Sequence, residues 1–150
     1  MAETLGSLCD KLTVLKLKEW HTNDPDRLED LALQSERIRG EIDAFLGNAL
    51  AGRIPLDALR APAHKVVKGE GNRVGPVEGD LGALVDRLAR TNCALWHEQE
   101  KVYEFEKVPP GEKDRVVKRL ARLNLERNEC IDAIDRELAR IAGKGGVKIP

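Results

Sequence analysis

The chain has 150 residues, of which 41% are apolar and 34% are charged, so we expect a single domain over residues 1–150 with a buried core and a charged surface. Aromatic residues make up only 3% of the chain, which favours aliphatic side chains packed between helices over a β-sheet. The 25 basic and 26 acidic residues nearly cancel, which makes a nucleic-acid partner unexpected, and no apolar run approaches the roughly 20 residues that cross a bilayer.

The first part of the chain has the pattern of a helical hairpin. Apolar residues recur at helical spacing through residues 3–21, with no proline between them. The sequence NDPD then offers Asn23 or Asp24 as an N-cap, with Pro25 at the first helical position. A second apolar stripe continues to residue 50, so we expect residues 3–50 to form two helices that pack antiparallel.

Residues 51–79 break this pattern, because prolines and glycines recur among short apolar steps. The sequence PLDAL suits a single helical turn, whereas the remainder predicts a long crossover across the other helices. In this crossover, two glycines are surrounded by Lys65, Lys68 and Arg73. We expect the segment to form a strand-like strap, and the alternative is an anion site.

Two further stripes predict helices over residues 80–106 and 113–142, separated by the Pro109-Pro110 turn. The glycines that follow residue 142 mark the end of the last helix. We therefore predict an all-α, antiparallel four-helix bundle made of two hairpins, residues 3–50 and 80–142, joined by a long crossover loop.

The two hairpins share a sequence pattern. DKLTVLKLKEWH, residues 10–21, and DRLARTNCALWH, residues 86–97, have aspartate, a basic residue, leucine, tryptophan and histidine at matching positions. The repeated Trp-His pairs therefore predict an internal duplication of one helical hairpin. His97 and His21 are each expected to be a boundary residue that bonds a carbonyl, in preference to acting as a ligand, and the neighbours of His21 suggest a helix end.

Polar residues lie close to the inward stripes of the last two helices and must be paired if they are buried. The candidate site residues are Asn92, Trp96, His97, Glu100, Asn124, Arg127, Asn128 and Asp132. One interpretation is structural, with Arg127 bridging a carboxylate such as Glu100. The other is a pocket between the third and fourth helices for a small polar or anionic ligand, in which Arg127 binds the charge and Trp96 forms a wall.

An acidic ladder suggests an alternative activity. Its members are Glu126, Glu129, Asp132 and Asp135, which face Glu98, Glu100, Glu104 and Glu106 on the preceding helix. Magnesium-dependent all-α nucleotide pyrophosphohydrolases hold their metals between such acids, so the alternative is a metal-dependent hydrolase or transferase acting on a nucleotide or phosphorylated sugar. The simpler interpretation of the ladder is a solvated charged face.

Cys9, Cys93 and Cys130 are odd in number and have no Cys-x-x-Cys spacing, so we expect small buried side chains instead of disulfides or a zinc site. The N-terminus lacks a signal-peptide pattern, so we expect a cytoplasmic protein with no membrane contact. The sequence indicates no catalytic residue, no metal ligand and no particular cofactor.

The run LWHEQEKVYEFEKVPPGEKDRVVKRLARLNLERNECIDAIDREL resembles an uncharacterised bacterial family of small helical domains of unknown function. The matching positions are Leu95, Trp96, His97, Glu100, Leu123, Asn124, Arg127, Asn128, Asp132 and Asp135. This resemblance implies a helical bundle and no established activity. From the residues and the resemblance together, the favoured function is a non-catalytic binding or scaffolding module, with helix faces available to a second copy or another protein partner.

Overall fold

The computed structural model describes residues 3–60 and 77–145, and within these ranges it contains four α-helices, two short 3-10 helices and no strand. The α-helices are α1 (Leu5–Trp20), α2 (Pro25–Leu50), α3 (Leu81–Tyr103) and α4 (Lys113–Gly145), and the 3-10 helices are η1 (Leu56–Leu59) and η3 (Phe105–Lys107). The predicted all-α class with four helices is confirmed. None of the described helices is both long enough and apolar enough to span a membrane.

Local signals in the sequence set the helix ends. The Asp24 side chain accepts a hydrogen bond from the backbone N–H of Asp26 at 3.1 Å, and Pro25 follows at the first position of α2. The sequence PLDAL does form a helical turn, which is η1. The last helix continues past Gly143 to Gly145, beyond the predicted end, because a glycine in a final turn weakens a helix without breaking it.

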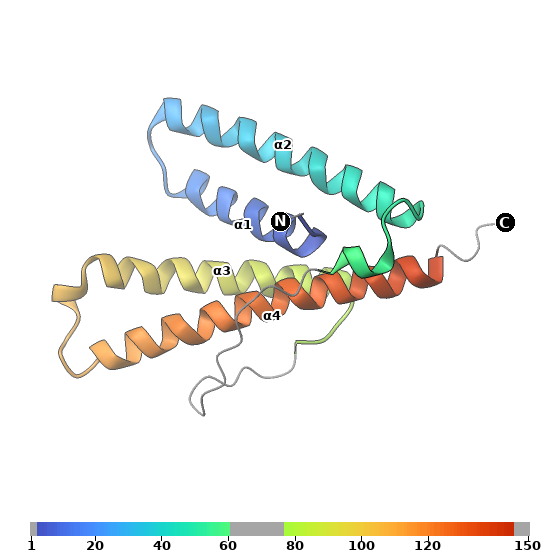
Figure 1. Ribbon diagram of the computed structural model, residues 1–150. Coiled ribbons are helices and arrows are strands. Elements are labelled where there is room, and N and C mark those ends of the chain that lie inside the picture. Colours follow the sequence, from blue (N-terminus) through green and yellow to red (C-terminus); the bar gives the residue numbers. More distant parts are fainter. Residues whose placement is uncertain (1–2, 61–76, 146–150) are drawn as a thin grey trace.

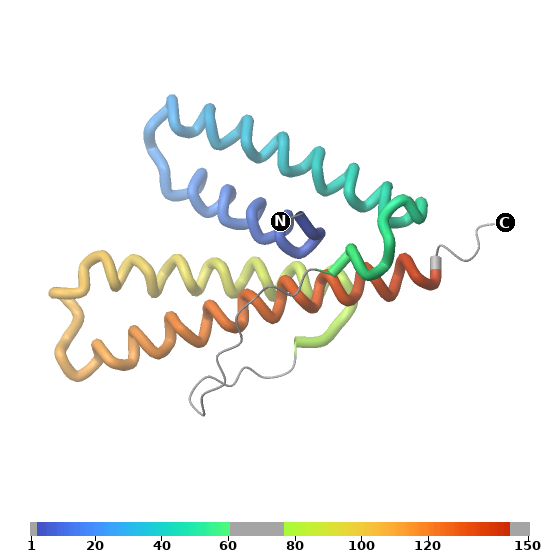
Figure 2. The backbone as a smooth tube through the Cα atoms, viewed as in Figure 1, coloured from blue at the N-terminus to red at the C-terminus, as the bar shows by residue number. Residues whose placement is uncertain are grey.

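The helices form two pairs that lie one above the other (Figure 1). The directions of α1 and α2 are opposite, as are those of α3 and α4, and α1 lies between α2 and the α3–α4 pair (Figure 1). The long helix α2 packs mainly on α1, and its C-terminal end leads into the segment that returns to α4 (Figure 2). Most of the outward surface of α2 is therefore open to solvent.

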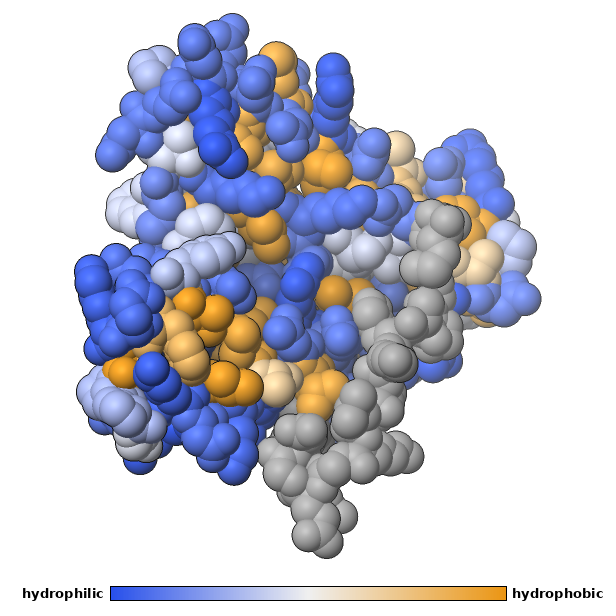
Figure 3. Space-filling view, turned by 60° about the vertical axis from the view of Figure 1, so that its left-hand side comes forward, coloured by the Kyte–Doolittle hydropathy of each residue, from blue (hydrophilic) through white to orange (hydrophobic). Residues whose placement is uncertain are grey.

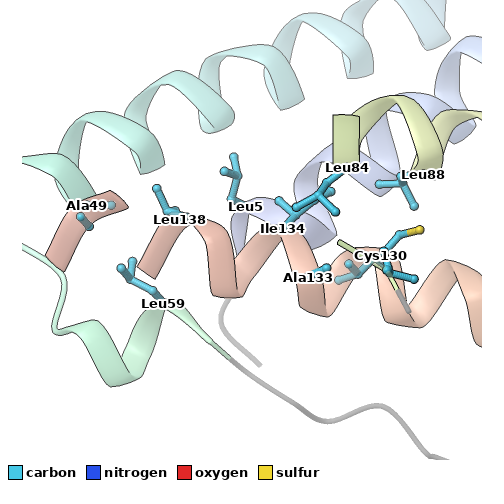
Figure 4. Close-up of a cluster of buried hydrophobic side chains, with 12 residues drawn as sticks. Leu5, Ala49, Leu59, Leu84, Leu88, Cys130, Ala133, Ile134 and Leu138 are labelled. Atoms are coloured by element: carbon cyan, nitrogen blue, oxygen red, sulfur yellow. The ribbon is translucent and has the colours of Figure 1, made fainter. Parts of the chain in front are cut away.

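The largest cluster of buried apolar side chains lies at one end of the molecule. Leu5 of α1, Leu84 of α3, and Ile134 and Leu138 of α4 meet there, and Leu59 of η1 closes the cluster (Figure 4). Burying each such side chain stabilises the fold by roughly 1.5–3 kcal/mol relative to leaving it exposed. At the opposite end, where the α1–α2 and α3–α4 turns lie, polar contacts carry more of the packing (Figure 1).

Hydrophilic side chains cover most of the face drawn in Figure 3. Apolar side chains gather on the lower half, which is formed by α3 and α4, and they also appear between the hydrophilic side chains of the upper half (Figure 3). The helices thus present alternating charged and apolar stripes, as expected of amphipathic helices.

Candidate functional site

A buried carboxylate joins three of the helices. Asp10 of α1 is only 5% exposed, and it faces α3 and α4. Asn92 of α3 donates from Nδ2 to Asp10 Oδ1 at 2.9 Å. Arg127 of α4 donates from Nε to Oδ1 at 2.8 Å and from Nη2 to Oδ2 at 2.5 Å, which is the two-pronged geometry that suits a guanidinium and a carboxylate. Asp10 therefore gives both predicted inward groups, the amide and the guanidinium, an acceptor.

Arg127 bridges a carboxylate, as the structural interpretation predicted, but this carboxylate is Asp10, and the suggested partner Glu100 is wrong. Eight residues separate Glu100 from Asn92, and at about 100° per residue this rotates Glu100 by roughly 80° away from the face that Asn92 occupies. The Glu100 side chain is accordingly 55% exposed, and its Oε1 lies 3.7 Å from Nδ1 of His97, which is also exposed. The hydrogen bond to Asp10 raises the pKa of the Arg127 guanidinium above its ordinary value, so Arg127 remains charged.

The Asp10–Arg127 pair lies against a cleft of about 420 Å³. Its other lining residues come from α1 and α2 and are Lys11, Val14, Leu15, Lys18, Gln34, Arg37, Ile38 and Glu41. The cleft that Arg127 lines is thus bounded by the first hairpin, whereas the sequence predicted a pocket between the third and fourth helices.

Cations outnumber acids in this cleft. Lys11 is paired with Glu3, and Arg127 is paired with Asp10. Within residues 3–60 and 77–145, Lys18 and Arg37 have no ion pair, and they face the cleft from opposite walls, on α1 and α2. Glu41, which also lines the cleft, has no ion pair among the described residues either, so these unpaired groups leave an excess of one cation. This excess gives the cleft a positive potential that would favour a bound anion.

The two Trp-His pairs meet at the end of α1. The His21 ring stacks on the Trp96 ring, with centroids 4.6 Å apart and planes at 22°. His21 Nδ1 also lies 2.7 Å from the Leu17 carbonyl oxygen, which confirms the expected helix-boundary role for this histidine. Trp20 is 85% exposed, in contrast to the half-buried Trp96. Equivalent residues of the two sequence repeats therefore have different surroundings.

The remaining candidate residues lie away from the cleft. Asn124 is exposed, and Asn128 and Asp132 are half-buried, with Asp132 engaged in an interaction of its own. Trp96 stacks on His21 and does not line the cleft. The anion site suggested around Lys65, Lys68 and Arg73 lies outside the described residues.

The acidic ladder and the acids that face it do not form one solvated face, because Asp135 of the ladder and Glu98 of the preceding helix are buried. Asp135 accepts a hydrogen bond from the Gly6 N–H at 2.8 Å, at the N-terminus of α1. Glu98 Oε1 accepts from Arg119 Nε at 3.0 Å and from Lys101 Nζ at 3.2 Å. Separate partners thus hold these acids, and the part of the chain that the structure describes contains no group of three or more metal-ligating side chains.

The three cysteines occupy three different environments. Cys130 is buried, and burial raises the pKa of its thiol. Burial, followed by the nearby carboxylates of Asp135 and Asp10, raises the pKa of Cys9 to about 11. Cys93 is exposed, so the prediction that all three are buried is wrong for this residue. The position of Cys93, one turn before His97, did not reveal its exposure, because composition alone does not orient a helix.

Sequence reasoning missed Asp10, Lys18 and Arg37. A signal for Asp10 was present, since Asn92 and Arg127 needed a buried acceptor and Asp10 stands within an apolar helix. No comparable signal marks Lys18 or Arg37, which have the ordinary spacing of surface cations. Comparisons with protein-family models, with curated proteins and with solved structures found no match.

Proposed function

We propose that the chain is a non-catalytic cytosolic binding module that holds a small anionic ligand in the cleft between α1, α2 and α4. The observation that carries this proposal is that two cations without an ion pair among the described residues, Lys18 and Arg37, lie on facing walls and outnumber the one unpaired acid, Glu41. Arg127, kept charged and oriented by Asp10, adds a guanidinium to the same cleft. The free thiols of the cysteines agree with a reducing compartment.

The lining also indicates the character of the ligand. Val14, Leu15 and Ile38 provide an apolar wall, so a ligand with an anionic group and a compact apolar or flat portion would use both parts of the cleft. Phosphate and carboxylate groups both suit Arg37, because a guanidinium can donate two parallel hydrogen bonds to either.

A thermal melt tests this function. The purified chain is heated with inorganic phosphate, nucleoside monophosphates, sugar phosphates and short dicarboxylates, each with and without a chelator. A ligand at about 100 times its dissociation constant adds about 2.7 kcal/mol to the free energy of unfolding, so the melting temperature should rise measurably.

Two variants of α2 localise the ligand. Arg37→Gln removes a cation from the cleft and should abolish the rise in melting temperature. Arg39→Gln removes one from the opposite flank of the same helix and should preserve it. If both variants lose the rise in melting temperature equally, the ligand binds elsewhere. If no compound raises the melting temperature of the original chain, the cleft is left without a function.

The alternative is a metal-dependent hydrolase or transferase acting on a nucleotide or phosphorylated sugar. No contact among the described residues favours it specifically, since the Glu100 side chain is exposed beside His97 and the buried Glu98 and Asp135 have other partners. Incubating the nucleotides and sugar phosphates of the same panel with the protein and magnesium, followed by product analysis, tests this alternative directly.

We also propose that the two helical pairs form one domain, an antiparallel four-helix bundle that arose by duplication of a hairpin. Leu8 and Leu84 are equivalent in the repeat and both are buried, as are Leu15 and Thr91, which supports a common origin. One domain of this size should unfold in a single cooperative transition. Two separate transitions would contradict the single-domain proposal.

A further inference from the structure

An acidic stripe runs along the exposed face of α2. Its members, at spacings i, i+3, i+4, i+7 and i+10, are Asp26, Glu29, Asp30, Leu33 and Glu36. These residues are all exposed, and the apolar Leu33 in their midst is 52% exposed. The four carboxylates have no ion pair within the described parts of the chain.

A basic stripe of the same spacing runs along the start of α4. Its members, at i, i+3, i+4 and i+7, are Arg115, Lys118, Arg119 and Arg122, and all are exposed. Lys118 pairs with Asp114 on the surface, and Arg119 pairs with Glu98. No acid among the described residues pairs with Arg115 or Arg122.

We propose that the acidic stripe of one copy of this chain binds the basic stripe of a second copy. Both stripes repeat every three or four residues and extend over about 10 Å or more along their helices, at 1.5 Å per residue. The acidic stripe also carries the exposed Leu33, which adds an apolar element to the contact. The match in spacing, length and opposite charge is the observation that selects this partner.

The stripes of one molecule do not reach each other. The helices α2 and α4 start at the same end of the molecule, but α1 and α3 lie between them (Figure 1). A second copy can place its basic stripe beside the acidic stripe of the first, and one such contact is enough to join the two copies in a dimer.

A nucleic acid is a less suitable occupant of the basic stripe. Four cations would contact only a few phosphates, and the exposed acids of α2 would repel the same polyanion. The proposed contact uses both stripes. It shares no residue with the lining of the cleft, so it goes beyond the ligand-binding function and does not depend on it.

Sedimentation equilibrium of the full chain measures this association. Surface charges act over about 10 Å at 0.1 M salt and about 3 Å at 1 M salt, so the dimer should form at the lower concentration and weaken about tenfold or more at the higher one. A chain that is monomeric at low salt would overturn the proposal, as would a dimer that is indifferent to salt.

Charge reversal supplies the sharper test. One variant carries Arg115→Glu with Arg122→Glu, and the other carries Glu29→Lys with Asp30→Lys. Each variant alone should be monomeric, because reversing two of the four charges leaves one of its stripes with no net charge. An equimolar mixture should dimerise, since the unchanged acidic stripe of one variant can bind the unchanged basic stripe of the other. Far-UV circular dichroism checks that both variants remain folded.

A control separates position from net charge. Glu100→Lys with Glu104→Lys changes the net charge as the α2 variant does, but on exposed positions of α3, and it should dimerise like the original chain. Self-association of either reversed variant alone, or failure of the mixture to dimerise, would overturn the proposal. Salt-sensitive binding of a single-stranded oligonucleotide by a monomeric chain, abolished by Arg115→Glu with Arg122→Glu, would assign the basic stripe to nucleic acid instead.

Discussion

At the scale of single residues, burial separates two aspartates that the sequence repeat treats as equivalent. Asp10 is buried and accepts hydrogen bonds from Asn92 and Arg127. Asp86 occupies the matching position of the second repeat, but it lies on the surface and pairs with Arg90 one turn away. A repeated residue type therefore does not carry a repeated role, because each copy packs against different neighbours.

Replacing each aspartate with alanine should show the difference. Asp10→Ala leaves a buried amide and a half-buried guanidinium without their acceptor, so the free energy of unfolding should fall by about 2 kcal/mol. Asp86→Ala removes one exposed ion pair and should change it by about 0.5 kcal/mol or less. Urea denaturation measures both values. Equal effects would mean that Asp10 contributes no more than a surface charge does.

At the scale of helices, a glycine sets the distance between α1 and α4. The Gly6 N–H donates to Asp135, and a Cβ at Gly6 would lie 2.3 Å from the Ile131 carbonyl oxygen. This oxygen belongs to helix backbone and cannot rotate aside as a side chain can. The two helices can therefore approach this closely only with glycine at position 6.

Gly6→Ala should lower the free energy of unfolding by about 2 kcal/mol, because α1 must move away from α4 to admit the methyl group. Gly40 in the middle of α2 is the matched control, since a Cβ there meets no atom within 4 Å. Gly40→Ala should raise the free energy of unfolding by about 1 kcal/mol through helix propensity. A neutral Gly6→Ala in denaturant titrations would show that the contact is loose.

The helices themselves were predictable because their signals are local. Apolar spacing, the Asp24–Pro25 start of α2 and the proline turn before α4 act within a few residues, and the structure has helices in these places. Which helix a polar face meets is not local information. The spacing placed Arg127 on an inward face, but only the packing of α1 against α4 decides that its partner is Asp10 and not Glu100.

The cleft could not be predicted for the same reason. Lys18 and Arg37 lie on different helices, and nothing in either segment distinguishes them from other surface cations. They become a candidate site only because α2 rests on α1 and leaves an open side toward Arg127. Two of the eight candidate residues, Asn92 and Arg127, do meet at a buried acceptor, whereas Lys18 and Arg37 came together only through the tertiary arrangement.

At the scale of the whole molecule, the apolar core is concentrated at one end. Leu88, Cys130 and Ile134 are fully buried there, together with Leu59 from the segment after α2. The other end, with the α3–α4 turn, relies more on polar contacts, such as that of the exposed Arg119 with the buried Glu98. Unequal packing of this kind allows one end to open while the other remains folded.

Amide hydrogen exchange followed by mass spectrometry should detect this inequality. Residues 84–92 and 130–138 should exchange slowest, and residues 101–116, around the α3–α4 turn, should exchange much faster, because opening that end exposes few apolar side chains. Ile134→Ala should speed exchange in both slow segments, whereas Leu33→Ala, at an exposed position, should leave them unchanged. Uniform protection along α3 and α4 would contradict this division.

If the division holds, the basic stripe lies in the part of the molecule that opens most easily, because it is at the start of α4. Dimerisation through that stripe should then slow the amide exchange of this segment selectively.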